Sequence, residues 1–334
     1  MKISLVIACF NEGPDLEATV ALAAASKPEL HEIIVVDDCS DKEFSVLSRM
    51  LSFPDIRVIR TPERLGAGPA KRFGGQYATG DAIVLSDSHM RFPWDWVATA
   101  EKSMATYPNA IWCCVSRGFE TDSQFCGCGG TLTYDKLGLE FGWREPSHPQ
   151  VADHTPCLLG GFYFIPKRIW DALDGLNPNF HGWGYEEADL SIRAWLYGFE
   201  VRRMNNLVVK HNYNRNLKGN FLNSWQSGFN SLVCHATLFE DGVWQEIRPY
   251  MFRMVAEEAI ARFEKKESEI MAFREKVQKS RKMSDKDVQA FTKFPTPTAG
   301  LMETLLLEHE QRLGEQRLAN HESMKSKKDA EQEV

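Results

Sequence analysis

Long hydrophobic runs are absent from this chain of 334 residues. No stretch approaches the roughly 20 apolar residues that a membrane-spanning helix needs. The apolar start of the chain is interrupted at residues 11–13, before it reaches the pattern of a signal peptide. Positive charge is not in excess either, because 39 Lys and Arg face 46 Asp and Glu. These absences exclude a membrane-embedded protein and a generally basic nucleic-acid-binding surface, and we expect a cytoplasmic protein.

Paired cysteines of the metal-binding type are also lacking. Of the eight cysteines, four lie close together, at Cys113, Cys114, Cys126 and Cys128, but their spacing matches no standard CxxC pair. We interpret them as reduced structural thiols, with a zinc site as the alternative. The glycines of residues 66–68 lack the full spacing of a P-loop or a dinucleotide-binding fingerprint.

The first third of the chain alternates predicted strands and helices. Apolar runs predict strands at residues 3–10, 33–36, 56–59 and 82–85. Apolar residues at helical spacing predict intervening helices at residues 15–25, 44–51 and 67–77. Such alternation predicts an α/β fold with a mostly parallel central sheet. Ligands of such sheets bind beyond the carboxyl ends of the strands.

The composition changes towards the C-terminus. A strand is expected at 158–165 and helices at 166–173 and 186–197, whereas Glu, Lys, Arg and Ala dominate after about Trp244. Within that region an apolar stripe at near-heptad spacing consists of Ile260, Phe263, Ile270, Phe273 and Val277. We interpret it as a helix packed on the body, with a coiled coil that forms a homo-oligomer as the alternative. A last helix is expected at 301–318.

A candidate metal site follows the predicted strand at 82–85. Asp87 and His89 are two residues apart just past this strand, so their side chains point the same way and can hold one divalent cation. A carboxylate with imidazole suits Mn²⁺ or Zn²⁺ better than Mg²⁺ or Ca²⁺. His211 follows another short strand and is the candidate third ligand. The alternative is a turn carboxylate beside a surface histidine.

Acidic residues occur at two further strand or helix ends. Asp37 and Asp38 follow a buried strand and could accept hydrogen bonds from a base or ribose, or cap a helix. Glu186 and Asp189 share one face of a predicted helix and could bind hydroxyls or act as a base, or only complement the helix dipole. Adjacent glycines at 160–161 indicate a close approach by ligand or backbone.

Taken together, these motifs resemble GT-A glycosyltransferases, and in particular the catalytic domain of the polypeptide N-acetylgalactosaminyltransferases. The matching segments follow in that family's order at residues 6–12, 32–41, 63–66, 78–81, 87–89, 160–165 and 183–195. His211 falls where the family has its third metal histidine. The chain looks like a bacterial or phage-type relative without a membrane anchor or lectin domain.

The resemblance implies an enzyme that moves a sugar from a UDP-sugar to a hydroxyl acceptor with retention of configuration. It implies Mn²⁺ or another divalent cation, held by Asp87, His89 and His211. The catalytic candidates are Glu186 and Asp87. The donor-binding residues that it implies are Ala8, Asn11, Glu12, Asp37, Arg64, Asp87, Gly160, Gly161, Trp183 and Glu186. Of these, Asp37 and Arg64 would hold the uridine and its ribose, while Ala8 could contact the base only through its backbone.

Several alternatives stay open at this point. Tyr185 stands where the family has the second Gly of Trp-Gly-Gly-Glu and would narrow the donor pocket. An inverting transferase of the same fold would use an acid near Glu186 to Asp189 as base, and a non-catalytic nucleotide-sugar-binding module is a further reading of the same motifs. The acceptor could be protein Ser or Thr, a glycan, a small molecule or a modified base in phage DNA. We expect a GT-A domain at residues 1–240, a helical extension at 241–320 and a disordered tail at 321–334.

Overall fold

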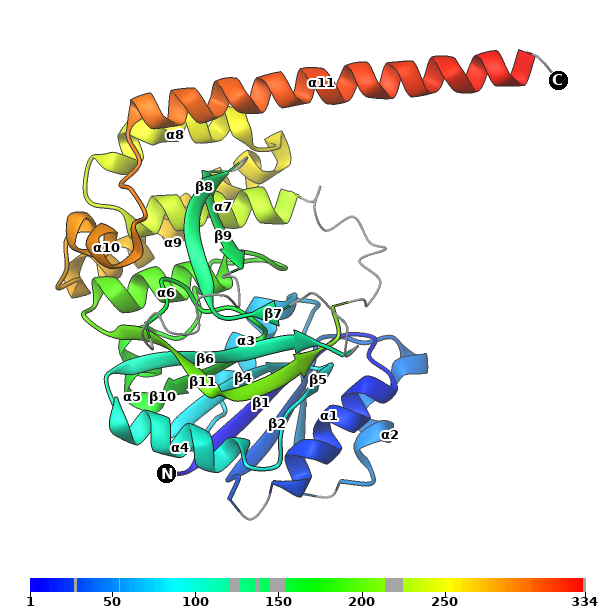
Figure 1. Cartoon of the computed structure of the whole chain (residues 1–334), viewed down its shortest axis with the longest axis vertical. Helices are drawn as coiled ribbons and strands as arrows, with labels where there is room; N and C mark the ends of the chain where they lie inside the picture. The colour runs from blue at the N-terminus through cyan, green and yellow to red at the C-terminus, as the bar shows by residue number, and fades with distance from the viewer. Residues whose placement is uncertain are drawn as a thin grey trace.

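A computed structural model describes residues 1–26, 29–53, 55–119, 126–135, 138–143, 154–213 and 225–332. Figure 1 shows a twisted sheet with helices on both faces, a further group of helices stacked above it, and a long C-terminal helix that extends beyond the body. The predicted α/β fold is therefore confirmed. No helix in the described part of the chain combines the length and apolar character needed to cross a membrane.

The central sheet combines a parallel half and a mixed half. Its strand order is β3 (Ile56–Arg60), β2 (Glu32–Asp37), β1 (Ile3–Cys9), β4 (Ala82–Asp87), β10 (Phe162–Pro166), β6 (Ala110–Gly118), β11 (Glu200–His211) and β5 (Met90–Arg91). The first four strands are parallel, as expected. The strand β10 runs antiparallel to both neighbours, and β11 runs parallel to β6. The short strand β7 (Cys126–Gly127) pairs with β6, while β8 (Gly130–Asp135) and β9 (Gly138–Trp143) form a separate hairpin.

Helices cover both faces of the sheet because its strands are apolar on both sides. The helices of the first half are α1 (Pro14–Ala25), α2 (Val46–Met50) after the 3₁₀ turn η1 (Lys42–Phe44), α3 (Ala67–Gly75) and α4 (Trp96–Thr106). The alternation along β1 separates the two layers, since Ile3, Leu5 and Ile7 join one buried cluster and Val6 joins the other. The carboxyl ends of the strands are consequently held between two packed layers.

The second half of the chain supplies the upper helices. They are α5 (Lys167–Ala172), α6 (Glu186–Leu196), α7 (Trp225–Leu238), α8 (Val243–Met254), α9 (Glu257–Ser280), α10 (Asp285–Thr292) and α11 (Ala299–Gln332). The apolar stripe expected at 260–277 packs inside the body, with Phe263, Ile270 and Val277 fully buried. This confirms the interpretation of α9 as a packed helix. A homo-oligomer formed through the C-terminal helices stays a prediction.

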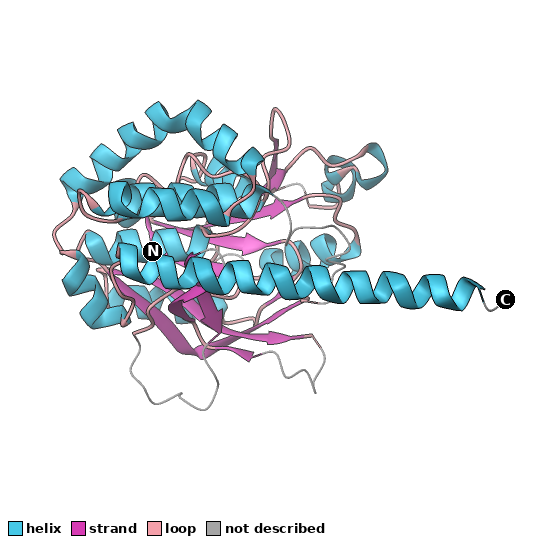
Figure 2. Ribbon diagram, turned by 90° about the horizontal axis from the view of Figure 1, so that it is seen from above, coloured by secondary structure: helices cyan, strands magenta, loops and turns pink. Residues whose placement is uncertain are grey.

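The last helix is longer than the sequence pattern indicated. Its first turns pack on α8 and bury Met302, Leu305 and Leu306, whereas Leu318 is exposed. Figure 2 shows that the C-terminal part of the helix extends beyond the body. The helix continues to Gln332, within the segment 321–334 for which we expected disorder. Residues 315–332 contain neither proline nor glycine, so no residue in this stretch strongly disfavours a helix.

Candidate active site

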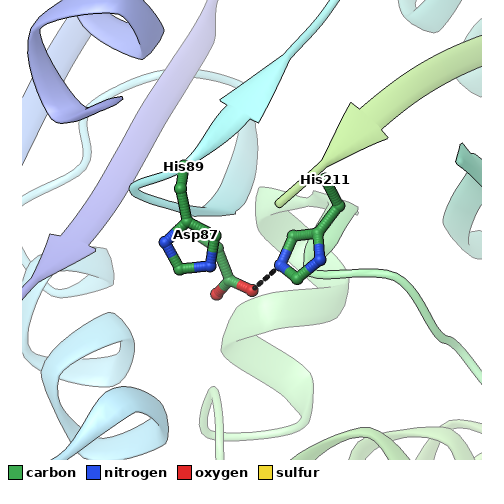
Figure 3. A group of neighbouring side chains, drawn as sticks. All are labelled: Asp87, His89 and His211. Atoms are coloured by element: carbon green, nitrogen blue, oxygen red, sulfur yellow. Dashed lines mark hydrogen bonds and ion pairs between the residues drawn. The ribbon is translucent and has the colours of Figure 1, made fainter. Parts of the chain in front are cut away.

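The three candidate metal ligands come together at one edge of the sheet. Asp87 ends β4, His89 lies two residues later, and His211 ends β11, where it pairs opposite Met90. One ligand atom from each lies within 4.8 Å of the others. His211 Nε2 is 3.1 Å from Asp87 Oδ2, although the two residues are 124 positions apart (Figure 3). The predicted convergence of these residues is confirmed.

The chemistry of this group fits a divalent transition metal. His89 Nδ1 lies 3.2 Å from a carboxylate oxygen of Glu12, which orients the imidazole ring. Burial lowers the pKa of His89, so its ring is neutral and able to act as a ligand at pH 7. Burial opposes the charge on Asp87, but the Lys71 ammonium and His211 outweigh it and hold the pKa of that carboxyl well below its usual range. One carboxylate with two imidazoles is a suitable donor set for Mn²⁺.

Lys71 belongs to this site, although the sequence interpretation did not include it. Its ammonium lies 2.5 Å from Asp87 Oδ1, and its side chain is only 9% exposed. One feature of the sequence could have indicated this role. Lys71 shares a face of α3 with Gly68 and Gly75, which are three and four residues away. Small neighbours on that face let the charged end reach the interior of the protein.

The glycine pair before β10 makes room for Asp87. Gly160 and Gly161 have φ values of +111° and +74°, and the Asp87 amide donates to the Gly161 carbonyl at 2.9 Å. A Cβ on Gly161 would lie 2.3 Å from Asp87 Oδ2. Close packing against the candidate metal ligand thus explains Gly161, while the donor-lining role of this pair stays a prediction.

Substitution of Gly161 by alanine should weaken metal binding. The new methyl group would displace the Asp87 carboxylate, and the left-handed backbone would cost about 1–2 kcal/mol for a residue with a Cβ. We expect Mn²⁺ affinity, measured by calorimetry, to fall at least about tenfold. A tenfold loss of affinity corresponds to about 1.4 kcal/mol of binding free energy. Gly13→Ala is the matched control, because a Cβ there meets nothing within 4 Å. Equal Mn²⁺ affinity in the two variants would contradict this explanation.

Glu186 lies at the start of α6 in a buried position. Its Oε2 accepts a hydrogen bond from the Gly184 amide at 2.8 Å, and a Cβ on Gly68 would lie 2.6 Å from its Oε1. Burial, together with the charge of Glu187, raises the pKa of Glu186 above the ordinary carboxyl range. A carboxyl group that keeps its proton near neutral pH can donate a hydrogen bond as well as accept one.

A hydrogen-bonded chain connects the same helix end to the metal group. The Tyr163 hydroxyl donates to Glu187 Oε1 at 2.5 Å and accepts from the Gly161 amide at 3.0 Å. Burial raises the pKa of Tyr163 well above its usual value, so the phenol remains a donor. Neither Tyr163 nor Glu187 had been predicted as part of the site, because their contact depends on how β10 packs against α6.

Asp189 does not share the role expected for it with Glu186. Its side chain is fully buried and forms an ion pair with Arg193 at 2.5 Å. Asn177 donates to its other oxygen at 3.0 Å. The prediction that the two acids form a functional pair is therefore wrong for Asp189. The helix α6 is buried on several faces. Two residues at helical spacing on it can therefore have different neighbours, and only one of them needs to face a ligand.

At the end of β2 the two aspartates have different partners. Asp37 accepts a hydrogen bond from the Ser40 amide at 2.8 Å and forms an ion pair with Arg60 at 2.5 Å. Asp38 is 3% exposed and accepts hydrogen bonds from the amides of Leu65 and Gly66, both at 2.7 Å. Asp38 therefore fixes the position of the loop that contains Arg64, a contact that sequence reasoning missed.

The remaining predicted donor residues lie around this edge. Ala8 is paired with Val36 and Asp87 in the sheet. The Arg64 guanidinium stacks 3.4 Å above the Phe10 ring. The Asn11 side chain exchanges hydrogen bonds with Asp41, so it joins the loop after β1 to the loop after β2. Their roles in donor binding stay predictions.

The loop that contains Arg64 and the loop that contains Trp183 are in contact. They are predicted to bind opposite ends of the donor. The Gly182 amide donates to the Leu65 carbonyl at 2.9 Å, and a Cβ on Gly66 would lie 2.2 Å from Gly182 Cα. Trp183 follows directly and is 43% exposed. In contrast, the Tyr185 ring is buried, although its backbone has a φ of +72° in the left-handed region that favours glycine.

The cysteines whose side chains the structure describes take no part in the candidate site. Cys113, Cys114 and Cys128 are buried, while the Cys126 side chain lies outside the described residues. Burial raises the pKa of Cys113 to about 11, which disfavours the thiolate that zinc requires. Among the side chains that the structure describes, Asp87, His89 and His211 form the one group with metal-ligand geometry.

Two family models match this chain. Glycosyl transferase family 2 matches residues 4–139, and the N-terminal domain of galactosyltransferase matches residues 144–216. Human polypeptide N-acetylgalactosaminyltransferase 10 is 29% identical over 230 residues, which cover 64% of this chain and 38% of that protein. N-acetylgalactosaminyltransferase 6 of Drosophila melanogaster is 27% identical over 215 residues, which cover 60% and 32%. The chain thus spans less than two fifths of these curated relatives.

Solved structures show the same fold. GalNAc-T7 with UDP, GalNAc and Mn²⁺ superposes with a TM-score of 0.64 at 20% identity, covering 87% of this chain and 56% of that chain. The mannosyltransferase PcManGT from Pyrobaculum calidifontis, in complex with GDP-Man and Mn²⁺, gives 0.50 at 15% identity and covers 93% and 86%. The chain therefore contains a glycosyltransferase domain of the GT-A fold that resembles the catalytic domain of the polypeptide N-acetylgalactosaminyltransferases.

Proposed function

We propose that this protein transfers a sugar from a UDP-sugar to a hydroxyl acceptor in a metal-dependent reaction. The observation that carries the proposal is the convergence of Asp87, His89 and His211 at the carboxyl edge of the sheet. Relatives that bear the name polypeptide N-acetylgalactosaminyltransferase support it, as does the GalNAc-T7 structure with UDP, GalNAc and Mn²⁺. The identity of the sugar and of the acceptor lies beyond this proposal.

The residues around the metal group have distinct parts in the proposed reaction. A divalent cation held by the three ligands would neutralise the charge that develops on a diphosphate leaving group. Lys71 keeps Asp87 ionised and adds a fixed positive charge to a buried site. Glu186 would position a hydroxyl of the donor sugar, since its carboxyl can both donate and accept a hydrogen bond. The exposed Trp183 ring offers an apolar face beside it.

We infer retention of configuration, with inversion as the second candidate. An inverting enzyme needs an ionised general base beside the acceptor. Asp189 is unsuitable, because it is fully buried and paired with Arg193. Glu186 is the remaining candidate of the two, but its raised pKa favours the protonated form near pH 7. The anomeric configuration of the product, determined by NMR, distinguishes the two mechanisms.

A donor-hydrolysis screen tests the proposed function without knowledge of the acceptor. The protein is incubated with UDP-, GDP-, ADP- and dTDP-sugars, with Mn²⁺ or with EDTA after metal stripping, and released nucleotide is measured. We expect Mn²⁺-dependent release from a UDP-sugar. Full activity in EDTA would contradict metal dependence, and release from none of the donors would contradict the transferase activity itself.

Binding of UDP with Mn²⁺ should raise the thermal stability. A ligand at one hundred times its Kd stabilises the folded state by about 2.7 kcal/mol, which corresponds to a rise in Tm of about 4 °C for a chain of this length. GDP with Mn²⁺ and UDP with EDTA serve as controls. Stabilisation by GDP and not by UDP would overturn the proposed uridine specificity.

A further inference from the structure

We propose that Asn230 is a positioning residue for the loop at residues 181–184, so that the helical layer forms part of the donor site. Asn230 lies on α7, beyond residue 216 where the second family match ends. This inference rests on the proposed function, because the loop contains Trp183 and leads into Glu186. It concerns a residue that acts through the loop and does not itself touch the donor.

Both polar atoms of the Asn230 amide bond to this one loop. Its Oδ1 accepts from the His181 amide at 2.9 Å. Its Nδ2 donates to the carbonyl oxygens of His181 at 3.0 Å and Gly184 at 2.9 Å, with a longer contact of 3.4 Å to Trp183. The side chain is fully buried. A primary amide has two N–H donors and one carbonyl acceptor, and all three have partners here.

The loop depends on contacts from outside because its own backbone is irregular. Gly182 and Gly184 have φ values of +70° and +109°, which prevents a regular helix or strand between His181 and Tyr185. The Gly184 amide is used by Glu186, and the Gly182 amide by Leu65. Asn230 binds both ends of the loop and thereby sets the backbone on either side of Trp183.

A continuous set of hydrogen bonds runs through the loop from the sheet to the helical layer. Asp38 at the end of β2 holds the amides of Leu65 and Gly66, and the Leu65 carbonyl accepts from Gly182. Asn230 then binds the far side of the loop. The helix α7 is itself fixed by its extensive packing on α9. Correct placement of the loop therefore requires the C-terminal helices.

Asn230→Ala and Asn230→Ser test this role against Thr237→Ala. Thr237 is a fully buried polar residue of the same helix whose hydroxyl bonds only within α7. A serine leaves a smaller cavity than alanine and keeps one hydroxyl that can form a hydrogen bond, so it provides a milder variant if the alanine variant does not fold. We expect hydrogen exchange at residues 181–184 to accelerate at least tenfold in Asn230→Ala, and to remain unchanged in Thr237→Ala.

Kinetic and binding measurements together distinguish an effect on the loop from an effect on the rest of the donor site. For Asn230→Ala we expect at least a tenfold loss of kcat/KM for UDP-sugar hydrolysis, while affinity for UDP with Mn²⁺ changes less than threefold. Exchange and turnover equal to those of Thr237→Ala would overturn the inference. If the unmodified protein hydrolyses no donor, the proposed function fails, and the exchange measurement still decides whether Asn230 positions the loop.

Discussion

His211→Ala is expected to abolish metal-dependent turnover while the protein remains folded. The substitution removes one of the three candidate ligands, and Asp87 and His89 alone would not hold a cation in the same geometry. Charge stabilisation by a bound metal is worth several kcal/mol of barrier, so we expect a loss of about 10³-fold or more in donor hydrolysis. Asp87 retains its ion pair with Lys71, which limits the structural damage.

The matched control for this variant is His154→Ala. His154 is 49% exposed at its side chain and pairs with Glu200 at the opposite end of β11 from His211. We expect this control to bind Mn²⁺ and to turn over as the unmodified protein does. Circular dichroism checks that both variants are folded, and calorimetry measures Mn²⁺ affinity. Turnover of His211→Ala at the level of His154→Ala would remove the basis of the proposed metal site.

Asp189→Ala is expected to cause the largest loss of stability. Arg193 is fully buried, and its guanidinium donates to Asp189 as well as to the carbonyl oxygens of Leu173 and Gly175. Removing the carboxylate leaves a buried charge without its counter-ion, which costs about 3–5 kcal/mol. The free energy of unfolding, measured by urea denaturation, gives this difference directly.

An exposed ion pair with the same spacing serves as the control for the effect of burial on stability. Lys167 and Asp171 have the same spacing of four residues on α5, but their side chains are 36% and 58% exposed. We expect Asp171→Ala to change stability by less than about 1 kcal/mol, because exposed ion pairs are screened by water. Equal destabilisation by Asp189→Ala and Asp171→Ala would show that burial of the first pair has no energetic consequence.

A double variant separates the effect of the unpaired charge from the effect of the lost side-chain volume. Asp189→Leu with Arg193→Met replaces both charges by apolar side chains and leaves no unpaired charge. We expect it to be more stable than Asp189→Ala, since well-packed apolar replacements of buried ion pairs are often tolerated. A double variant that is less stable than the single one would indicate that the hydrogen bonds of Arg193 to Leu173 and Gly175 dominate the effect.

Local sequence patterns predicted the first strands, and together with the family resemblance they predicted the candidate metal group. The strands β1 to β4 follow directly from apolar runs that are bounded by polar residues, and their carboxyl ends share one edge of the sheet by topology. Asp87 and His89 were identified because their spacing and their place beyond a strand are both visible in the sequence. His211 required the further assumption that its strand ends at the same edge, which the pairing of β11 with β5 confirms.

The partners of individual side chains could not be predicted from local sequence patterns. Asp37 and Asp38 are adjacent and chemically identical, yet only Asp38 reaches the loop at 65–66. Glu186 and Asp189 share a helix face, yet one lies beside the glycine turn at 184 and the other pairs with Arg193 in the core. Such differences depend on which neighbours pack against each side chain.

The sequence by itself determined the α/β fold and the order of its first strands, because these depend on periodicity and on chain order. It also singled out three candidate metal ligands, through their places after strands and the family resemblance. Only the tertiary structure decided that Lys71 pairs with Asp87, that Asp189 belongs to the core, and that Asn230 holds the loop beside Trp183. The physical reason is that burial and the packing of neighbouring segments set each of these roles, and residue spacing along the chain does not settle them alone.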